Sequence, residues 1–189
     1  MHAPGNPGAA RILVNMIKPS PETYRSIKGL RVVRSYRPDP LSQDDLDAIL
    51  QAGRWTGSSK NRQSWTLVVI TDAEQKRRLA ECGDFTKPLL NAPLVIAPIR
   101  LEDGYDWDLG RLSQNLMLAA AARGVGSCPI TLHREDDGKK VLGVPAGHGS
   151  RFVIAMGYPD DDAEEQSRRR SPLSGRKDLS DIVRYEGFS

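Results

Sequence analysis

The strongest pattern in this sequence is an apolar, alanine-rich stretch that predicts a helix from Asp108 to Ala122. One face of this helix is formed by residues at helical spacing: Leu109, Leu112, Leu116, Ala119 and Ala120. The many alanines permit another backbone to approach closely, and Gly124 and Gly126 provide an end for the helix. This pattern is typical of a helix at the centre of a domain or at an interface.

Other helices and strands are expected to alternate along the chain. Helices are predicted at residues 23–30, 42–53 and 72–81, and strands at residues 65–70, 94–97 and 151–156. Ser42, followed three residues later by Asp45, resembles a capping box, and Asp72 can cap the next helix. Because no internal repeat is present, the alternation predicts an α+β (α/β/α) fold with a mixed central sheet flanked by helices.

The length of 189 residues is sufficient for one compact domain. We place this domain at residues 22–189, after a flexible arm of residues 1–21 that is rich in Gly and Pro. No apolar run approaches the ~20 residues needed to cross a bilayer, and no signal-peptide pattern is present. The net charge of +3 does not indicate nucleic-acid binding. The sequence therefore predicts a cytoplasmic protein without a membrane or nucleic-acid partner.

The cysteines and histidines do not form a recognisable metal-binding pattern. Cys82 and Cys128 belong to no CxxC pair, and His2, His133 and His148 are scattered. Both cysteines are therefore interpreted as small buried residues, and no metal site is predicted.

The charges near the C-terminus are divided into two blocks. An acidic run from Asp160 to Glu165 precedes a basic run from Arg168 to Lys177. The acidic run is interpreted as a solvated linker. The basic run is either a solvated tail or a segment that binds a phosphate group.

Three polar segments lie at the ends of the expected elements, where ligand-binding groups are often found. Residues 34–37 combine two arginines with a serine, which suits a phosphate, although such a segment is often an ordinary turn. Residues 58–63 are dense in donors and acceptors, and they form either a polar loop or a ligand contact. In residues 126–131, Gly and Pro can present backbone groups to a ligand.

Taken in this order, the segments resemble the nitroreductase family. The family pattern R-R-S-x-R corresponds to residues 33–37, and P-S-x-x-N-x-Q-P-W corresponds to residues 57–65. The remaining counterparts are the segment from Asp108 to Ser127, which is a helix followed by G-x-G-S, the sequence Met156-Gly157-Tyr158-Pro159, and the basic sequence Gly175-Arg176-Lys177. The resemblance covers residues 22 to 187, and it depends on five motifs in register rather than on any single one.

The resemblance implies a domain-swapped homodimer that binds two FMN molecules at the subunit interface. By this resemblance, the phosphate, the ribityl chain and the pyrimidine edge of FMN lie close to Arg34, Ser35 and Arg37. A cation such as Arg37 near the pyrimidine edge would stabilise the negative charge of reduced flavin.

The rest of the implied site comes from three other segments. The other subunit contributes Ser58, Ser59 and Asn61. The backbone of the first subunit faces the flavin ring at Pro129, Ile130 and Thr131. Arg176, with Arg170 as an alternative, closes around the phosphate.

The sequence departs from the family pattern at several positions. Val33 replaces the first arginine, and Gly57 and Ser64 replace two prolines. Only a short connection separates the strand near Ala97 from the helix at Asp108, where larger members of the family place a helical lid. The resemblance therefore implies a site that is either open or covered by the N-terminal arm of a partner.

The implied activity is an FMN-dependent oxidoreductase reaction that uses NAD(P)H in a ping-pong mechanism. The implied acceptors are nitroaromatics, quinones or similar small electrophiles, and no catalytic side chain is required, because FMN carries the chemistry. Two alternatives remain open at this stage. One is an FMN-binding or storage protein with little turnover, and the other is a family member that acts on flavin itself.

Overall fold

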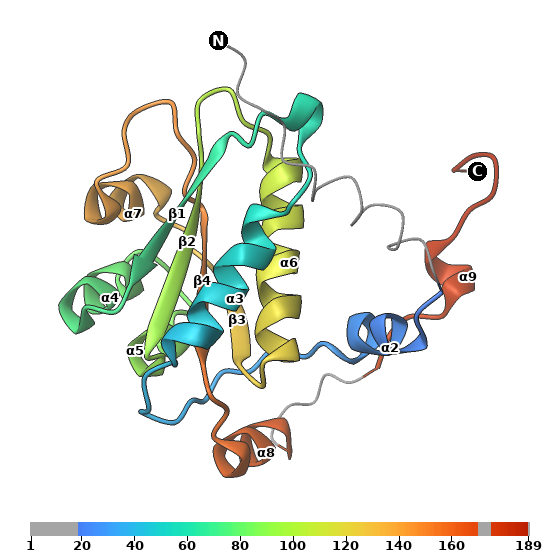
Figure 1. Ribbon diagram of the computed structural model, residues 1–189, viewed down its shortest axis with the longest axis horizontal. Helices are drawn as coiled ribbons and strands as arrows, with labels where there is room; N and C mark the ends of the chain where they lie inside the picture. The colour runs from blue at the N-terminus through green and yellow to red at the C-terminus, as the bar shows by residue number, and fades with distance from the viewer. Residues whose placement is uncertain (1–18, 170–174, 189) are drawn as a thin grey trace, which may run out of the picture.

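The computed structural model describes residues 19–169 and 175–188. In this part of the chain, four strands form a sheet in the order β1-β2-β4-β3. The strands are β1 (Trp65–Ile70), β2 (Leu94–Arg100), β3 (Gly126–Thr131) and β4 (Phe152–Gly157). Helices cover both faces of this sheet (Figure 1), which confirms the predicted α+β class with its α/β/α layers.

The pairings between neighbouring strands are antiparallel, whereas the sequence predicts a mixed sheet. The long crossover helix α6 (Asp106–Ala122) joins β2 to β3. Strand β4 lies between β2 and β3, so the crossover does not make parallel strands neighbours. The described residues therefore provide no parallel pairing, and the mixed sheet is corrected to an antiparallel one.

Strand β2 is longer than predicted because it continues through Pro98 to Arg100. Arg100 exchanges backbone hydrogen bonds with Gly149, which lies on the side of β2 that faces β4 rather than β1. The backbone of Pro98, two residues earlier, faces this same side. The pairing with β4 on that side ends at Ile96. The missing N–H of Pro98 therefore costs no hydrogen bond with β4.

One face of the sheet packs against α3 (Gln43–Arg54) and α6. The fully buried residues of this layer include Ile49, Ile96, Leu112, Leu116, Ile154 and Met156. Ser42 caps α3, as predicted, by accepting a hydrogen bond from the Asp45 N–H at 3.1 Å. A Cβ on Gly53 would lie 2.7 Å from Leu116 Cδ2. The close approach of the two helices therefore depends on a glycine of α3.

The opposite face packs against α4 (Ala73–Ala80), α5 (Lys87–Asn91) and α7 (Glu135–Leu142). The buried residues here include Ile70, Leu79, Leu89, Val95 and Val153. Cys82 and Cys128 belong to the same core, which confirms that both are small buried residues.

Three further helices lie at the periphery of the domain: α2 (Pro21–Gly29), α8 (Asp161–Arg169) and α9 (Leu179–Ile182). Helices α2 and α9 lie away from the sheet (Figure 1) and bury no residue. Ser20 caps α2, which begins two residues before the predicted start at Thr23. Of the predicted arm, residues 1–18 lie outside the described part of the chain.

Residues 19–169 and 175–188 contain neither a helix that could span a membrane nor a cluster of side chains that could bind a metal ion. No helix in these ranges combines the length and the apolar character that crossing a bilayer requires. Within the same ranges, no group of three His, Cys, Asp or Glu side chains is arranged to bind a metal ion.

Candidate functional site

A cavity of about 830 Å³ runs along the edge of the sheet that β3 forms. Val32 and Arg34 line one part of it, and residues 84–88 with Leu90 line another. The remaining wall is formed by residues 128–131 and His133. The cavity therefore brings together four predicted site residues: Arg34, Pro129, Ile130 and Thr131.

Strand β3 presents part of its backbone to this cavity because it is an edge strand. Val33 N–H donates to Ser127 O at 2.9 Å, so the backbone of Ser127 faces away from β4. By the alternation of an antiparallel strand, the backbone groups of Pro129 and Thr131 also face the open edge. Ile130 differs from the prediction, because its backbone faces β4 and its side chain is buried.

Residues 33–37 run beside β3, and the surrounding backbone holds them in place. Arg37 N–H donates to Tyr158 O at 2.9 Å, and Asp160 N–H donates to Ser35 O at 3.1 Å. Together with the bond from Val33, these contacts tie both ends of the segment to the sheet. Its conformation is therefore set by the tertiary fold.

The acidic run at residues 160–165 is not the solvated linker that the sequence predicts. It begins α8, and Glu164 is only 5% exposed. Glu164 Oε1 accepts hydrogen bonds from the backbone N–H groups of Arg34 at 2.6 Å and Ser35 at 2.7 Å. A buried carboxylate becomes acceptable when such donors satisfy it, which explains why one acid of the run leaves solvent.

The charged groups around the cavity make it locally positive. Arg34 and Lys87 both line the cavity, and within the described residues their charged groups make no hydrogen bond or ion pair. The acid in the wall, Asp84, is paired instead with Arg134 at 2.8 Å. The Arg134 hydrogen bond lowers the pKa of the Asp84 carboxyl, so this acid remains ionised and compensated. Two cations are thus available to an anionic ligand.

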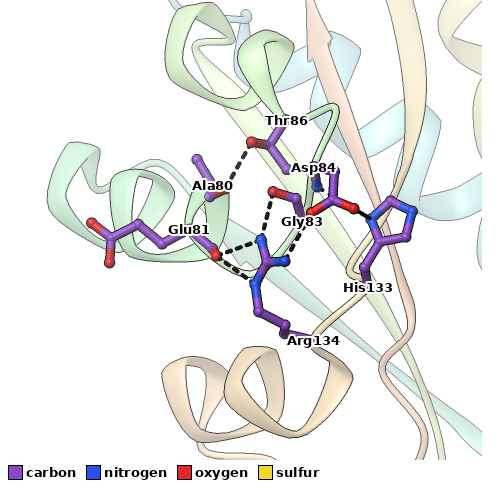
Figure 2. A network of polar contacts seen from close by, with 7 residues as sticks. All are labelled: Ala80, Glu81, Gly83, Asp84, Thr86, His133 and Arg134. Atoms are coloured by element: carbon purple, nitrogen blue, oxygen red, sulfur yellow. Dashed lines mark hydrogen bonds and ion pairs between the residues drawn. The ribbon is translucent and has the colours of Figure 1, made fainter.

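The loop between α4 and α5 forms the rim of the cavity, and Arg134 holds this loop in place (Figure 2). The Arg134 guanidinium donates to Glu81 O and to Gly83 O, both at 2.8 Å. A Cβ on Gly83 would lie 2.6 Å from Thr131 O, so only glycine allows the loop to lie this close to β3. The rim therefore depends on Arg134 and on the absence of a side chain at Gly83.

Phe85 and His133 form an aromatic part of the same rim. Their rings pack edge to face with centroids 6.2 Å apart, and the Phe85 side chain is largely exposed. His133 Nδ1 accepts a hydrogen bond from the Asp84 N–H at 3.2 Å. An exposed aromatic ring at the mouth of a cavity can contact a flat ligand.

The cysteine in the cavity wall is not prepared to act as a nucleophile. Cys128 is 5% exposed, and burial raises the pKa of its thiol. The thiol therefore remains protonated near neutral pH. Burial likewise raises the pKa of the neighbouring Tyr36, whose hydroxyl donates to Val33 O at 2.6 Å.

The predicted residues Ser58, Ser59 and Asn61 lie in a separate, tightly turned loop around the short helix η1 (Ser59–Asn61). Lys60, Asn61 and Gln63 have φ values of 52°, 53° and 53°, which lie in the left-handed region. Ser58 Oγ accepts a hydrogen bond from the Gln63 N–H at 2.8 Å, so Ser58 stabilises the loop itself. Such strained, non-glycine turns are enriched at functional sites.

Within one chain this loop precedes β1, at the opposite edge of the sheet from the cavity beside β3, and it is far from the Arg34 end of that cavity. Arg111 in the first part of α6 donates to Gly57 O at 2.7 Å, whereas Val33 packs against Gly126, beyond the other end of that helix. The helix between Arg111 and Ala122 alone spans about 16 Å. In Figure 1 the turn that joins α3 to β1 accordingly lies at the opposite end of the molecule from α8. The structure therefore does not bring the two sets of predicted residues together in one chain.

Three more predicted residues lie outside the cavity wall. Arg37 pairs with Asp39 at 3.4 Å and stacks on the Tyr158 ring at 5.3 Å. Ser35 follows Arg34 but does not line the cavity. Arg176 is exposed, and its guanidinium bonds to the neighbouring carbonyl of Gly175. The alternative residue, Arg170, lies outside the described part of the chain.

Comparisons with known proteins agree with this architecture. A relative from Archaeoglobus fulgidus is 29% identical over 154 residues, which cover 76% of this chain and 88% of the relative. The FMN reductase [NAD(P)H] of Bacillus subtilis is 25% identical over 173 residues, which cover 78% of this chain and 70% of that protein. The structure of an FMN-dependent nitroreductase from Clostridium difficile superimposes with a TM-score of 0.71 at 25% identity, over 87% of this chain and 99% of that chain.

A family model covers most of the described domain. The nitroreductase family model matches residues 27–82 and 87–158, which contain most of the cavity wall, the strained loop and the whole sheet. Only four residues of the cavity rim, 83–86, interrupt the match. With the fold, the order of the motifs and the family model in agreement, this chain belongs to the nitroreductase family.

Proposed function

We propose that this protein is an FMN-dependent oxidoreductase that uses NAD(P)H in a ping-pong mechanism to reduce nitroaromatics, quinones or similar small electrophiles. The observation that carries this proposal is the cavity beside β3, which combines an open strand edge with two cations that have no ion-pair partner in the described part of the chain. The names of the B. subtilis and C. difficile relatives support FMN as the ligand. We further propose that the protein acts in the cytoplasm, where NAD(P)H is supplied.

The residues of the cavity fit the chemical groups of FMN. Arg34 and Lys87 can neutralise a phosphate, because neither charge is paired within the described residues. The outward backbone of Pro129 and Thr131 can bond to polar atoms at the edge of a flat ring. The volume of about 830 Å³ falls within the range of small-molecule sites.

The remaining contacts are proposed to come from a second copy of the chain. Ser58, Ser59 and Asn61 cannot reach the cavity of their own chain, but a symmetric dimer can place them at the cavity of the partner. Apolar side chains that a partner could cover are exposed on helices α2 and α9: Tyr24, Ile27, Leu179 and Ile182. The proposed active form is therefore a homodimer with two shared sites.

When it is bound, FMN supplies the redox chemistry by accepting a hydride from NAD(P)H and passing it to the second substrate. The chain contributes binding and orientation. Arg34 and Lys87 hold the anionic part of the cofactor, while the β3 edge orients its ring. Phe85 lies at the mouth of the cavity, where it can contact a flat substrate.

Absorbance spectroscopy provides the first test of this proposal. The purified protein is mixed with FMN, freed of unbound flavin, and titrated with NADH or NADPH without oxygen. We expect one flavin per chain and rapid bleaching by at least one nicotinamide, followed by recovery of the colour when a quinone or nitroaromatic is added.

Each stage of that experiment can contradict a different part of the proposal. Protein that retains no flavin contradicts the whole proposal. Bound flavin that bleaches no faster than free FMN supports the storage alternative instead. Bleached protein that regains its colour only with oxygen contradicts the proposed acceptors.

A further inference from the structure

Glu164 differs from the rest of the acidic run in which it lies. It is 5% exposed, whereas its neighbour Glu165 is exposed and pairs with Arg169 on the same helix. Burying a carboxylate is costly unless hydrogen bonds compensate it. The contacts of Glu164 should therefore reveal why this acid is buried.

Both compensating bonds come from the segment that carries Arg34. The backbone N–H groups of Arg34 and Ser35 donate to the same oxygen, Glu164 Oε1, at 2.6 Å and 2.7 Å. These residues are separated from Glu164 by 130 and 129 positions in the sequence, so the contact exists only in the folded chain. Charge-assisted bonds of this length are among the stronger ones in proteins.

These bonds have a consequence for how the segment can contact a ligand. With Val33 bonded to Ser127 and Arg37 to Tyr158, the backbone donors on both sides of Arg34 are also occupied. A phosphate therefore cannot use these backbone N–H groups. Recognition is left to the side chains, chiefly that of Arg34, which lines the cavity.

We propose that Glu164 is a positioning residue, which fixes the backbone at Arg34 and Ser35 so that the Arg34 guanidinium points into the cavity and selects a phosphorylated flavin. This role rests on the proposed function, because it presumes that FMN occupies the cavity. Glu164 itself does not line the cavity. Its effect on the ligand passes through Arg34.

Two properties of Glu164 can be separated by substitution. Glu164→Gln keeps the length of the side chain and a carbonyl acceptor but removes the charge. Glu164→Asp keeps the charge but is one methylene shorter, so it cannot bond to both N–H groups without a shift of α8. If position is what matters, the shorter acid is the more damaging change. The matched control is Glu165→Asp, on the same helix but exposed.

The experiment measures the dissociation constants of FMN and riboflavin by quenching of flavin fluorescence. The ratio of the two constants reports recognition of the phosphate, and riboflavin binding shows in the same sample that the protein is folded. We expect E164D to reduce the preference for FMN by about tenfold, because the orientation of one charge-assisted contact is lost. We expect E164Q to reduce it by about threefold or less, and E165D to leave it unchanged.

Two results would overturn this role for Glu164. One is a preference for FMN in E164D that equals that of the unaltered protein. The other is a greater loss in E164Q than in E164D, which would show that charge rather than position matters. If the unaltered protein binds neither flavin, the proposed function itself fails. If it binds both flavins equally, Arg34 does not recognise phosphate, and the role of Glu164 fails while flavin binding stands.

Discussion

The cavity segment 33–37 and the loop at residues 57–63 both carry polar side chains, yet the chain holds them differently. The cavity segment is bonded to β3, to the residues after β4 and to Glu164 on α8. The loop is held by bonds within itself, such as that of Gln63 to Ser58, and by Arg111 of α6. It is also largely exposed.

This difference indicates which half of the site one chain can complete. The cavity segment is fixed by contacts far apart in the sequence, so its geometry is present in every folded copy. The loop already has a defined but strained shape. Within the described residues the Ser59 side chain makes no hydrogen bond, and Asn61 Oδ1 accepts one from Gln63 of the same loop at 3.1 Å. The strained conformation of this loop is not compensated by contacts with the rest of its own chain, as far as the structure describes it. Contacts with a ligand shared by two subunits would compensate it in a dimer.

The largest effect is expected from Arg34→Ala, which removes the cation of the cavity segment 33–37. Loss of a charged contact to the FMN phosphate should weaken FMN binding by about 10- to 100-fold. Riboflavin binding should change little. Fluorescence titration of both flavins measures this, and Arg78→Ala, an exposed change on α4, provides the control. Equal losses for the two flavins would show that Arg34 does not contact the phosphate.

Subunit mixing tests whether the loop belongs to the cavity of another copy. Arg34→Ala and Asn61→Ala place their defects in different halves of the site, so a mixed dimer contains one intact site. A statistical mixture of the two variants should therefore recover about one quarter of the flavin sites. Bound flavin per chain, measured after subunit exchange, gives the recovered fraction.

The control for this mixing experiment pairs Arg34→Ala with Lys87→Ala. Both residues line the cavity of the same chain, so each site in a mixed dimer keeps one defect. No recovery is expected from this pair. Equal recovery in the two mixtures would contradict the assignment of the loop to the partner.

A smaller effect is expected when the pH is changed, because the contribution of the Asp84–Arg134 pair at the cavity rim to the free energy of unfolding depends on pH. The Arg134 hydrogen bond lowers the pKa of the Asp84 carboxyl, so the bond stabilises the folded state above the ordinary pKa of about 4. This stabilisation is lost as the pH falls through the lowered value. Asp84→Asn should therefore lower the free energy of unfolding near neutral pH, and its difference from the unaltered protein should shrink at about pH 3.

Urea unfolding at both pH values measures this difference. Asp136→Asn is a suitable control, because the Asp136 side chain is 91% exposed and lies 3.7 Å from Lys139. Exposed pairs of this kind contribute little to stability. A destabilisation by Asp84→Asn that is the same at both pH values would show that the ionised pair with Arg134 is not its cause.

The smallest effect is expected from Lys60→Gly in the strained loop. Lys60 has a φ of 52°, which glycine adopts without strain. The relief of strain should exceed the added entropy of the unfolded chain, for a net gain of about 0.5 kcal/mol. Arg62→Gly, at an ordinary φ of −67°, should instead cost about 0.5 kcal/mol. Thermal unfolding of both variants compares them, and a loss of stability in Lys60→Gly would argue that this turn is not strained.

Much of the fold could be predicted from local patterns. Leu112, Leu116 and Ala120 are buried in α6 as their spacing indicates, and Ser42 and Asp72 cap their helices as predicted. These features depend on neighbours within a turn or two, so the local sequence contains the necessary information. The direction of strand pairing depends instead on strands that are distant in the sequence. The prediction of a mixed sheet was therefore wrong, and the described strands pair antiparallel.

The candidate site was less accessible to sequence reasoning. Arg34 stands out because it lies in a family motif, and Pro129 because it lies in the polar segment 126–131; the structure places both in one cavity. Glu164 and Arg134 were missed, since nothing in an acidic run or a polar turn distinguishes one charge from its neighbours. Lys87 precedes a proline at the start of a short helix, which is too weak a signal to identify it.

The sequence by itself determined four of the helices, three of the strands, the caps of α3 and α4 and the family, because these follow from residue spacing and from motifs in order. Strand β3 and the helices α5, α7 and α8 were not predicted. Only the tertiary structure decided which acid is buried, which β3 groups face outward and which polar residues share a cavity. The physical reason is that burial and hydrogen-bond partners are set by contacts between segments as far apart as Arg34 and Glu164. No local pattern records such contacts.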